Sequence, residues 1–276
     1  MNKKISATQK AMFACIVVLL LAHLPFGLSP VQAEQSQNGF DLVEKIKLFF
    51  FGTGRQKSPI GIPTGRQRGG AVRGRCSNSD KQIIALVPST KEGIKEGIPF
   101  VEQTISERPT FWFYVPYPGL NAEFVLINSQ GEDVYATTFL LNQQPGIIEL
   151  KLPQTIPLLQ QSNEYRWVLS AICNPQNRAA DAVVNGRLKR IPISLALNNQ
   201  LKKVSAKNQE VSAYAEANLW YETLTTLSEL QQNEPQNAQI KADWANVLQL
   251  VGLPPKVPQT WVTYFLPNSN KNSRSN

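Results

Sequence analysis

The sequence is poor in the side chains on which many enzymes and metal sites depend: its 276 residues include one histidine, two methionines and three cysteines. The histidine, His23, lies in a predicted secretory signal peptide, residues 1–33. Three lysines precede a short apolar run at residues 11–22, and the pattern from Val31 to Ala33 fits a cleavage site. A chain cleaved there has no histidine, which excludes Ser-His-Asp and Cys-His catalysis and His-ligated metal sites. The sequence therefore predicts neither a metal site nor a cofactor.

Long hydrophobic runs are also missing. His23 and Pro25 interrupt the apolar run of the leader, well short of the ~20 residues that a membrane-spanning helix needs. An uncleaved membrane anchor is the alternative, but we expect the leader to be removed and no spanning segment to remain. The expected location is the periplasm or the outside of the cell.

Two cysteines, Cys76 and Cys173, remain after the leader. In an oxidising, exported setting such a pair predicts one disulfide, because paired thiols there oxidise and stay oxidised. This bridge closes a loop of about 100 residues, which the chain-entropy model values at up to ~4–5 kcal/mol. Two buried free thiols, or a reactive pair, are the alternatives.

Acidic residues are absent from the stretch between residues 45 and 78, which holds eight basic ones. The chain carries a net charge of +8, and the leader contributes three lysines and no acid, so about +5 remains after cleavage. The excess is confined to this stretch, and the rest of the chain is close to neutral. This distribution argues against a globular face that binds nucleic acid.

The segment from Gly61 to Cys76 has five glycines and four arginines, a composition that cannot bury a core. We therefore expect residues 34–81 to form a basic, flexible arm. A hypothesis of polyanion binding, to an anionic lipid or polysaccharide, rests on its arginines: Arg66, Arg68, Arg73 and Arg75. RNA-binding segments usually have aromatic side chains between their arginines, and this segment has none. Its glycines also lack the spacing of a phosphate-binding loop. A solvated linker is the simpler interpretation.

A short helix is predicted inside this region. From Phe40 to Phe51 the apolar residues recur near helical spacing. Such an amphipathic helix lies either on a membrane surface or on the body of the protein. We expect it to pack on the body.

The densest aromatic stretch runs from Ser106 to Tyr117, S-E-R-P-T-F-W-F-Y-V-P-Y. In a strand, Phe111, Phe113 and Val115 point to one face and the residues between them to the other. Because both faces are apolar, the stretch predicts a central strand that is covered on both sides. The alternative is an exposed platform for sugar rings or a peptide, formed by Trp112, Tyr114, Tyr117 and Trp167.

Strand-like runs follow one another from residue 82 to 192. They are Gln82–Val87, Thr110–Val115, Glu123–Asn128, Val134–Leu141, Ile147–Leu152, Tyr165–Ile172 and Ala182–Ile191. Seven short strands with turn residues between them predict an antiparallel β-sandwich. The alternate residues from Tyr165 to Cys173 share one face, which places Cys173 at the end of a core-facing row.

Residues 193–253 have a helical period instead. Glu210 to Gln232 and Ile240 to Val251 carry apolar residues three and four apart, and a break at Asn233-Glu234-Pro235 separates them. The pair is similar to a tetratricopeptide hairpin, although a solenoid needs about three such units. We expect a helical hairpin packed on the sheet, giving an α+β protein. Residues 254–276 are expected to form a tail, disordered at its end.

Several of these segments resemble one family, the cyanobacterial domain of unknown function 928. They are G-R-x-R-G-G-A-x-R-G-x-C, the aromatic run, A-E-F-V-L-I-N, Y-R-W-x-L-x-x-I-C-N-P and A-x-L-W-Y-E-T-L-T-T-L-x-E-L. They occur in order between about Gly65 and Leu253. The resemblance implies an exported cyanobacterial protein, and it implies no activity and no catalytic residue.

Four polar residues in predicted loops are candidates for chemistry: Glu107, Arg108, Arg178 and Asp181. Glu107 and Asp181 are the candidate acids of a carbohydrate hydrolase that works without histidine. They lie in separate loops, so ion pairs or backbone hydrogen bonds that fix those loops are the simpler expectation. Together with Tyr117, the two arginines are candidate binding residues at the surface.

The sequence thus predicts a non-enzymatic binding or protein-interaction module of the cell envelope. Its expected partner is an envelope protein or a polysaccharide, and not a nucleic acid. The alternatives are the hydrolase described above and a polyanion binder that acts through the arginine-rich arm.

Overall fold

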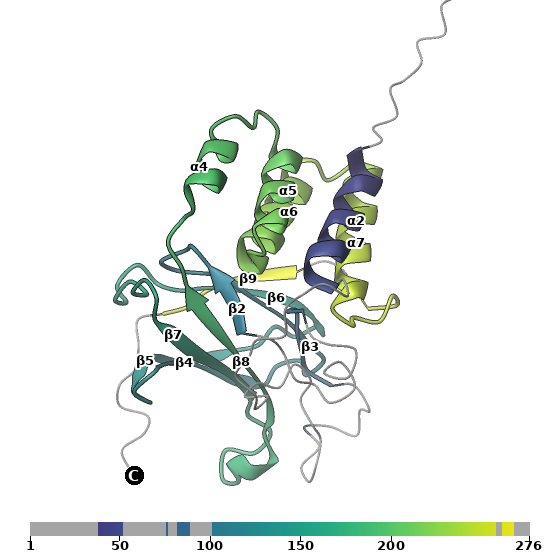
Figure 1. Ribbon diagram of the computed structural model, residues 1–276. Helices are drawn as coiled ribbons and strands as arrows, with labels where there is room; N and C mark the ends of the chain where they lie inside the picture. Colours follow the sequence, from purple (N-terminus) through teal and green to yellow (C-terminus); the bar gives the residue numbers. More distant parts are fainter. Residues whose placement is uncertain (1–37, 52–75, 77–81, 89–100, 258–260, 268–276) are drawn as a thin grey trace, which may run out of the picture. The chain divides into compact units, whose positions relative to one another are not determined.

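Two β-sheets and five α-helices make up the part of the chain that the structure describes (Figure 1). This computed structural model describes residues 38–51, 76, 82–88, 101–257 and 261–267. The predicted leader, the four arginines of the predicted arm and the end of the chain lie outside these residues. The protein is of the mixed α+β class, as the sequence predicts.

The helices and strands match most of the predicted segments. The helices are α2 (Asn38–Phe51), α4 (Leu195–Leu201), α5 (Lys207–Glu216), α6 (Trp220–Asn233) and α7 (Ala238–Leu250), with a short 3-10 helix η1 (Arg178–Ala180). The strands are β1 (Ile84–Ala85), β2 (Val101–Thr104), β3 (Phe111–Val115), β4 (Asn121–Asn128), β5 (Asp133–Leu140), β6 (Gly146–Lys151), β7 (Glu164–Ala171), β8 (Ala182–Arg190) and β9 (Trp261–Phe265). All seven predicted strands are present, whereas β2, β9 and α4 were not predicted.

The four-stranded sheet has the order β1-β3-β6-β9, and β3 lies inside it. All five residues of β3 are buried. The ring of Phe111 lies 5.0 Å from that of Phe124 in the other sheet, and Phe113 lies 5.4 Å from Trp167 there. On the opposite face, the ring of Trp112 lies 5.6 Å from that of Trp244 in α7. The prediction of a strand covered on both sides is therefore confirmed.

The five-stranded sheet has the order β2-β8-β7-β4-β5. The contacts of this sheet with β3 fit the predicted sandwich. The expectation of purely antiparallel pairing is wrong, because β2 pairs in parallel with β8 and β6 pairs in parallel with β9. Parallel neighbours need a long crossover between them. Two further strands and four helices separate β6 from β9 along the chain, so no local turn signal announces this pairing.

Strand β7 supplies the predicted core-facing row. Tyr165, Trp167, Leu169 and Ala171 are all buried. Trp167 lies opposite Gly186 of β8, where a Cβ atom would come within 2.2 Å of the indole ring. Glycine is therefore required at this position for the close approach of the two strands.

The predicted helical run from Glu210 to Gln232 is two helices, α5 and α6. Asn218 between them has a φ of 56°, a left-handed conformation that asparagine adopts more readily than most residues. The predicted break before Pro235 is present, and it separates α6 from α7. Helix α6 packs mainly against α5, and the likeness to a tetratricopeptide hairpin is not confirmed.

Helix α2 packs on the body of the protein, as we expected for this segment. Its residues Leu42, Ile46 and Phe50 are buried, and the helix contacts α5 and α7. The ring of Phe50 meets Trp220 of α6 edge-on at 4.9 Å. This helix, which the sequence placed in a flexible arm, therefore contributes to the hydrophobic core.

The start of α6 joins the helices to the strands. The buried Glu222 carboxylate accepts hydrogen bonds from the Thr104 hydroxyl (2.6 Å) and from the backbone of Ile105 (2.9 Å) and Ser106 (3.1 Å). Burial raises the pKa of Glu222, and these hydrogen bonds work in the opposite direction. The Trp220 indole donates to the Leu86 carbonyl oxygen at 2.8 Å. Polar contacts thus fix the helices on the sandwich.

The structure contains the predicted disulfide between Cys76 and Cys173. The two Cα atoms lie 4.5 Å apart, and the bridge spans 97 residues of sequence. Cys173 follows the end of β7, so the disulfide ties the segment before β1 to the core.

Candidate functional site

Glu107 and Arg108 hold loops together. The Glu107 carboxylate pairs with the Arg190 guanidinium at the end of β8, with 2.9 Å between nitrogen and oxygen. Arg108 donates to the carbonyl oxygens of Gln154 (2.7 Å) and Ile156 (3.1 Å). The side chains of this charged pair are therefore engaged in fixing the loop before β3 to the loop after β6.

Arg178 and Asp181 form a similar group at the other end of β8. Arg178 pairs with Glu123 at 3.0 Å and with Asp181 at 2.5 Å, and Asp181 accepts a hydrogen bond from the backbone of Cys173 at 3.2 Å. Partial burial acts against the charged guanidinium, but the two carboxylates outweigh it and raise the Arg178 pKa. The group stabilises the loop that follows the disulfide.

The two candidate acids do not form a catalytic pair. Glu107 lies beside Arg190 at the end of β8, and Asp181 directly precedes that strand. Nine residue steps of extended chain separate Asp181 from Arg190, which corresponds to roughly 30 Å at ~3.3 Å per residue. The carboxyl groups of glycosidases lie within ~5–10 Å of each other. A glycosidase mechanism that uses both acids is therefore excluded by distance.

The aromatic residues do not form an exposed platform. Trp112, Tyr114 and Trp167 are each at most 3 % exposed, and Tyr117 is 6 % exposed. Their rings belong to the hydrophobic core. The interpretation of this stretch as a strand buried in the core is therefore correct.

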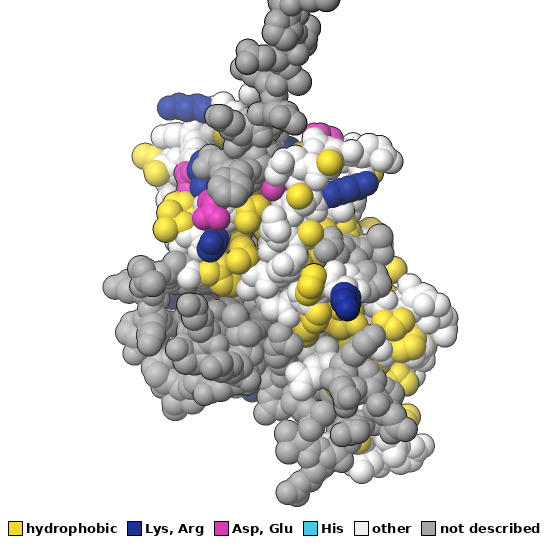
Figure 2. All heavy atoms as spheres, turned by 90° about the vertical axis from the view of Figure 1, so that its right-hand side faces the viewer, with side chains coloured by type: hydrophobic (Ala, Val, Ile, Leu, Met, Phe, Trp, Pro, Cys, Tyr) yellow, Lys and Arg dark blue, Asp and Glu magenta, His cyan; other side chains and the backbone are white. Residues whose placement is uncertain are grey.

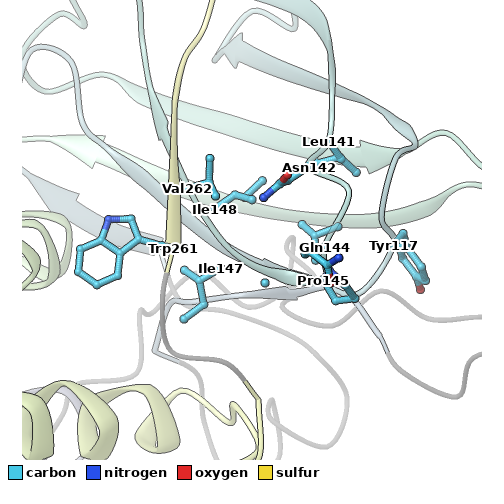
Figure 3. Close-up of a pocket in the computed structure, with 11 residues that line it drawn as sticks. Tyr117, Leu141, Asn142, Gln144, Pro145, Ile147, Ile148, Trp261 and Val262 are labelled. Atoms are coloured by element: carbon cyan, nitrogen blue, oxygen red, sulfur yellow. The ribbon is translucent and has the colours of Figure 1, made fainter.

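Tyr117 does line a small cavity between the loop after β5 and the start of β9 (Figure 3). The cavity has a volume of about 90 Å³, and Figure 3 shows Trp261 and Val262 on one side of it and Tyr117 on the other. Asn142 and Gln144 add polar side chains to its wall. Burial raises the pKa of Tyr117, partly offset by a hydrogen bond with the backbone of Ile83. Sites for drug-sized molecules measure ~300–1,000 Å³, so this cavity suits one small side chain.

Strand β9 forms one edge of the four-stranded sheet and pairs only with β6 among the described residues. Its sequence, W-V-T-Y-F, has no charge and no proline, the features with which natural edge strands usually block pairing. Phe265 is 78 % exposed and Val262 40 % exposed, and Leu140 of the neighbouring β5 is 57 % exposed. No described strand pairs with this outer edge, and the exposed side chains beside it are apolar.

Side-chain contacts on both faces of the sheet hold β9 in place. On the side of the helices, the Trp261 ring lies 4.8 Å from Trp244 and 5.5 Å from Trp112. The Thr263 hydroxyl donates to the buried Glu149 carboxylate. On the side of the other sheet, the Tyr264 ring lies 5.2 Å from Phe139 of β5. Side chains thus hold the strand in place, while no described strand pairs with its outer edge.

This edge was missed in the sequence, where residues 254–276 were expected to be a tail. The available signal was a run of five residues of high strand propensity between Pro258 and Pro267. No sequence pattern could have predicted the cavity, because the residues that line it come from three separate segments.

Other predicted sites remain outside what the structure tests. Arg66, Arg68, Arg73 and Arg75 lie outside the described residues. Among the described residues, no cluster of three or more cysteine, histidine or acidic side chains is arranged to hold a metal ion. No helix in that same part of the chain is both long and apolar enough to cross a membrane. On the face that Figure 2 shows, hydrophobic, basic and acidic side chains are mixed.

The fold defines a class: a mixed α+β protein. Its described polar clusters hold loops, and three of its exposed apolar residues, Leu140, Val262 and Phe265, lie on the edge strand β9 or on neighbouring β5. Comparison with known proteins adds the family. Residues 68–260 match the family model "Domain of Unknown Function (DUF928)", and the chain belongs to this family. No curated protein and no solved structure matches the chain. Both α2 and β9 lie outside the matched residues.

Proposed function

We propose that this protein is a non-enzymatic protein-interaction module that adds an extended segment of a partner to the edge of β9. The observation that carries the proposal is the open, uncharged edge, next to the exposed side chains of Val262 and Phe265. An edge strand offers a row of backbone donors and acceptors, and a partner strand satisfies them in register.

The surroundings of β9 support this mode of binding. In strand addition, main-chain hydrogen bonds supply affinity and pockets for alternate side chains supply specificity. The cavity of about 90 Å³ beside Val262 and Tyr117 is of the size for one such side chain. The contacts of Trp261 with Trp112 and Trp244 keep the strand fixed. The strand therefore loses little conformational entropy when a partner binds.

The proposed location is the cell envelope, outside the cytoplasm. The disulfide between Cys76 and Cys173 supports it, because such bridges persist in oxidising compartments. The leader pattern of residues 1–33 supports it independently. The distance between Glu107 and Asp181 weighs against the hydrolase alternative.

Site-specific photocrosslinking in the cells that produce the protein tests the proposal. A photoreactive residue replaces Phe265 in one variant and Leu48 of α2 in the matched control, since Leu48 is also exposed, at 65 %. We expect the variant at position 265 to crosslink to an extended segment of another polypeptide, located by mass spectrometry. The added substitution Val262→Lys should suppress that product, because a lysine on the edge blocks strand pairing.

Two results would contradict the proposal. One is equal crosslinking at positions 265 and 48. The other is a product at position 265 that persists unchanged with Val262→Lys.

A further inference from the structure

The sequence of β9 is complementary to itself. When two copies of W-V-T-Y-F run antiparallel about a two-fold axis at Thr263, Val262 lies opposite Tyr264 of the second copy, and Trp261 lies opposite Phe265. Each of these is an apolar or aromatic pair, the type that stabilises neighbouring strands. No like charges meet, because the strand has none.

We propose that the strand that occupies the β9 edge is β9 of a second copy of this chain. This inference rests on the proposed function, because it names the partner of the same edge. The two four-stranded sheets become one continuous sheet of eight strands, with β9 of each copy at its centre. The contact is isologous, so it closes at the dimer and leaves neither β9 edge open.

The side chains at the ends of β9 favour this partner. Phe265, Lys151 and Trp261 lie on the same face of the sheet, since Lys151 pairs with Phe265 and alternate residues share a face. The Lys151 ammonium lies 5.6 Å from the centre of the Phe265 ring and 3.2 Å from the Glu149 carboxylate. Trp261 of the second copy meets Phe265 beside this ammonium, where an indole ring gains a cation–π contact.

The opposite face contributes a second apolar contact. Val262 and Tyr264 point toward the five-stranded sheet, where Tyr264 packs on Phe139 and Leu140 is 57 % exposed. Among the described residues, Lys151 is the basic residue in contact with β9, and its ammonium already pairs with the Glu149 carboxylate. The local chemistry therefore fits an uncharged aromatic and β-branched strand, which is what β9 itself is.

The expected affinity is modest. Five residues of β9 and a few neighbours are far fewer than the ~20–30 residues that each partner contributes to a standard interface. A dissociation constant of roughly 1–100 µM is therefore expected. Dimer formation should therefore be measured over a series of protein concentrations.

Sedimentation velocity on the protein, purified in the form that accumulates in cells, measures this association between about 1 and 300 µM, bracketing the affinity expected for so small an interface. We expect the weight-average mass to rise toward twice that of the monomer. Val262→Lys and Phe265→Lys should each abolish the rise, while Leu48→Lys, the same change on exposed α2, should leave it intact. Circular dichroism checks that all three variants are folded.

The register is tested separately with Thr263→Cys. Position 263 faces itself across the two-fold axis, and Cβ atoms of directly opposite residues lie ~4.5–5.5 Å apart. Mild oxidation should therefore yield a covalent dimer several-fold faster than Leu48→Cys does. A melting curve checks that loss of the Thr263 hydrogen bond to Glu149 leaves the variant folded.

A monomer at every concentration, with equal oxidation rates for Thr263→Cys and Leu48→Cys, would overturn the dimer. If position 265 still crosslinks to a different polypeptide in cells, the proposed function stands and only the identity of the partner is wrong. If neither dimer nor crosslink forms, both proposals fail.

Discussion

Replacing Gly186 by alanine tests the close approach of β7 and β8. The new Cβ atom would come within 2.2 Å of the Trp167 ring, and the contacts of that ring restrict its movement. Trp167 is 1 % exposed, lies 5.4 Å from the Phe113 ring and donates a hydrogen bond of 2.9 Å to the Tyr221 hydroxyl. Gly186→Ala must therefore shift either the indole ring or the strand.

The expected cost follows from these contacts. Overpacking costs about 1–3 kcal/mol, and a weakened Trp167 hydrogen bond adds about 0.5–1.5 kcal/mol. Replacing glycine lowers the entropy of the unfolded chain, which returns about 0.4–1 kcal/mol. We expect a net loss of roughly 2 kcal/mol in the free energy of unfolding. With a urea m-value of about 3 kcal/mol/M, the midpoint falls by about 0.7 M.

Urea unfolding followed by tryptophan fluorescence measures this loss. Asn185→Ala is the matched control, because its side chain points to the other face of β8. The double variant of Gly186→Ala with Trp167→Phe should cost less than the sum of the single changes, since the smaller ring relieves the clash. A Gly186→Ala protein within about 0.5 kcal/mol of the wild type, the size of an ordinary surface effect, would refute the argument.

Two further predictions concern the disulfide and a buried acid. Cys76→Ser combined with Cys173→Ser should lower the free energy of unfolding by up to ~4–5 kcal/mol, measured by urea midpoints, and reductant should shift the wild type but not the double variant. Burial raises the pKa of Asp243 from 3.8 to about 6, so the stability it contributes is full below pH 3.8 and is lost as the pH rises through 6. Asp243→Asn should therefore raise the free energy of unfolding at pH 8, by up to ~3 kcal/mol at 1.36 kcal/mol per pKa unit, and leave it unchanged at pH 3.5. An equal effect at both pH values would show that the gain is not linked to titration.

The local patterns were sufficient for most elements. The alternating apolar residues of β3 and β7 predicted their buried faces, because side chains of a strand point alternately to its two sides. The break before Pro235 ended α6, because proline cannot continue a helix. Cys76 and Cys173 had no competing partner after the predicted leader, so their pairing followed from the cysteine count and the expected compartment. Each of these inferences depends on residues that lie near one another in sequence or on a simple count.

The candidate site depended on contacts that no local pattern contains. The edge of β9 exists because this strand pairs in parallel with β6, more than a hundred residues earlier in the chain. The cavity beside Tyr117 is assembled from three separate segments. Strand propensity alone could have marked Trp261 to Phe265 as a strand, but not as an edge.

The sequence by itself determined the class of the protein, its aromatic core strand and its disulfide, because these follow from side-chain period, composition and cysteine count. Only the tertiary structure decided the roles of the polar residues. Glu107 and Asp181 are equally plausible acids in the sequence, yet they lie at opposite ends of β8 and each is held in an ion pair. The fold likewise shows that β9, an uncharged strand, pairs on one side only among the described residues. Distance and exposure are properties of the folded chain, and they weigh against the catalytic alternative and locate the candidate binding site at an exposed sheet edge.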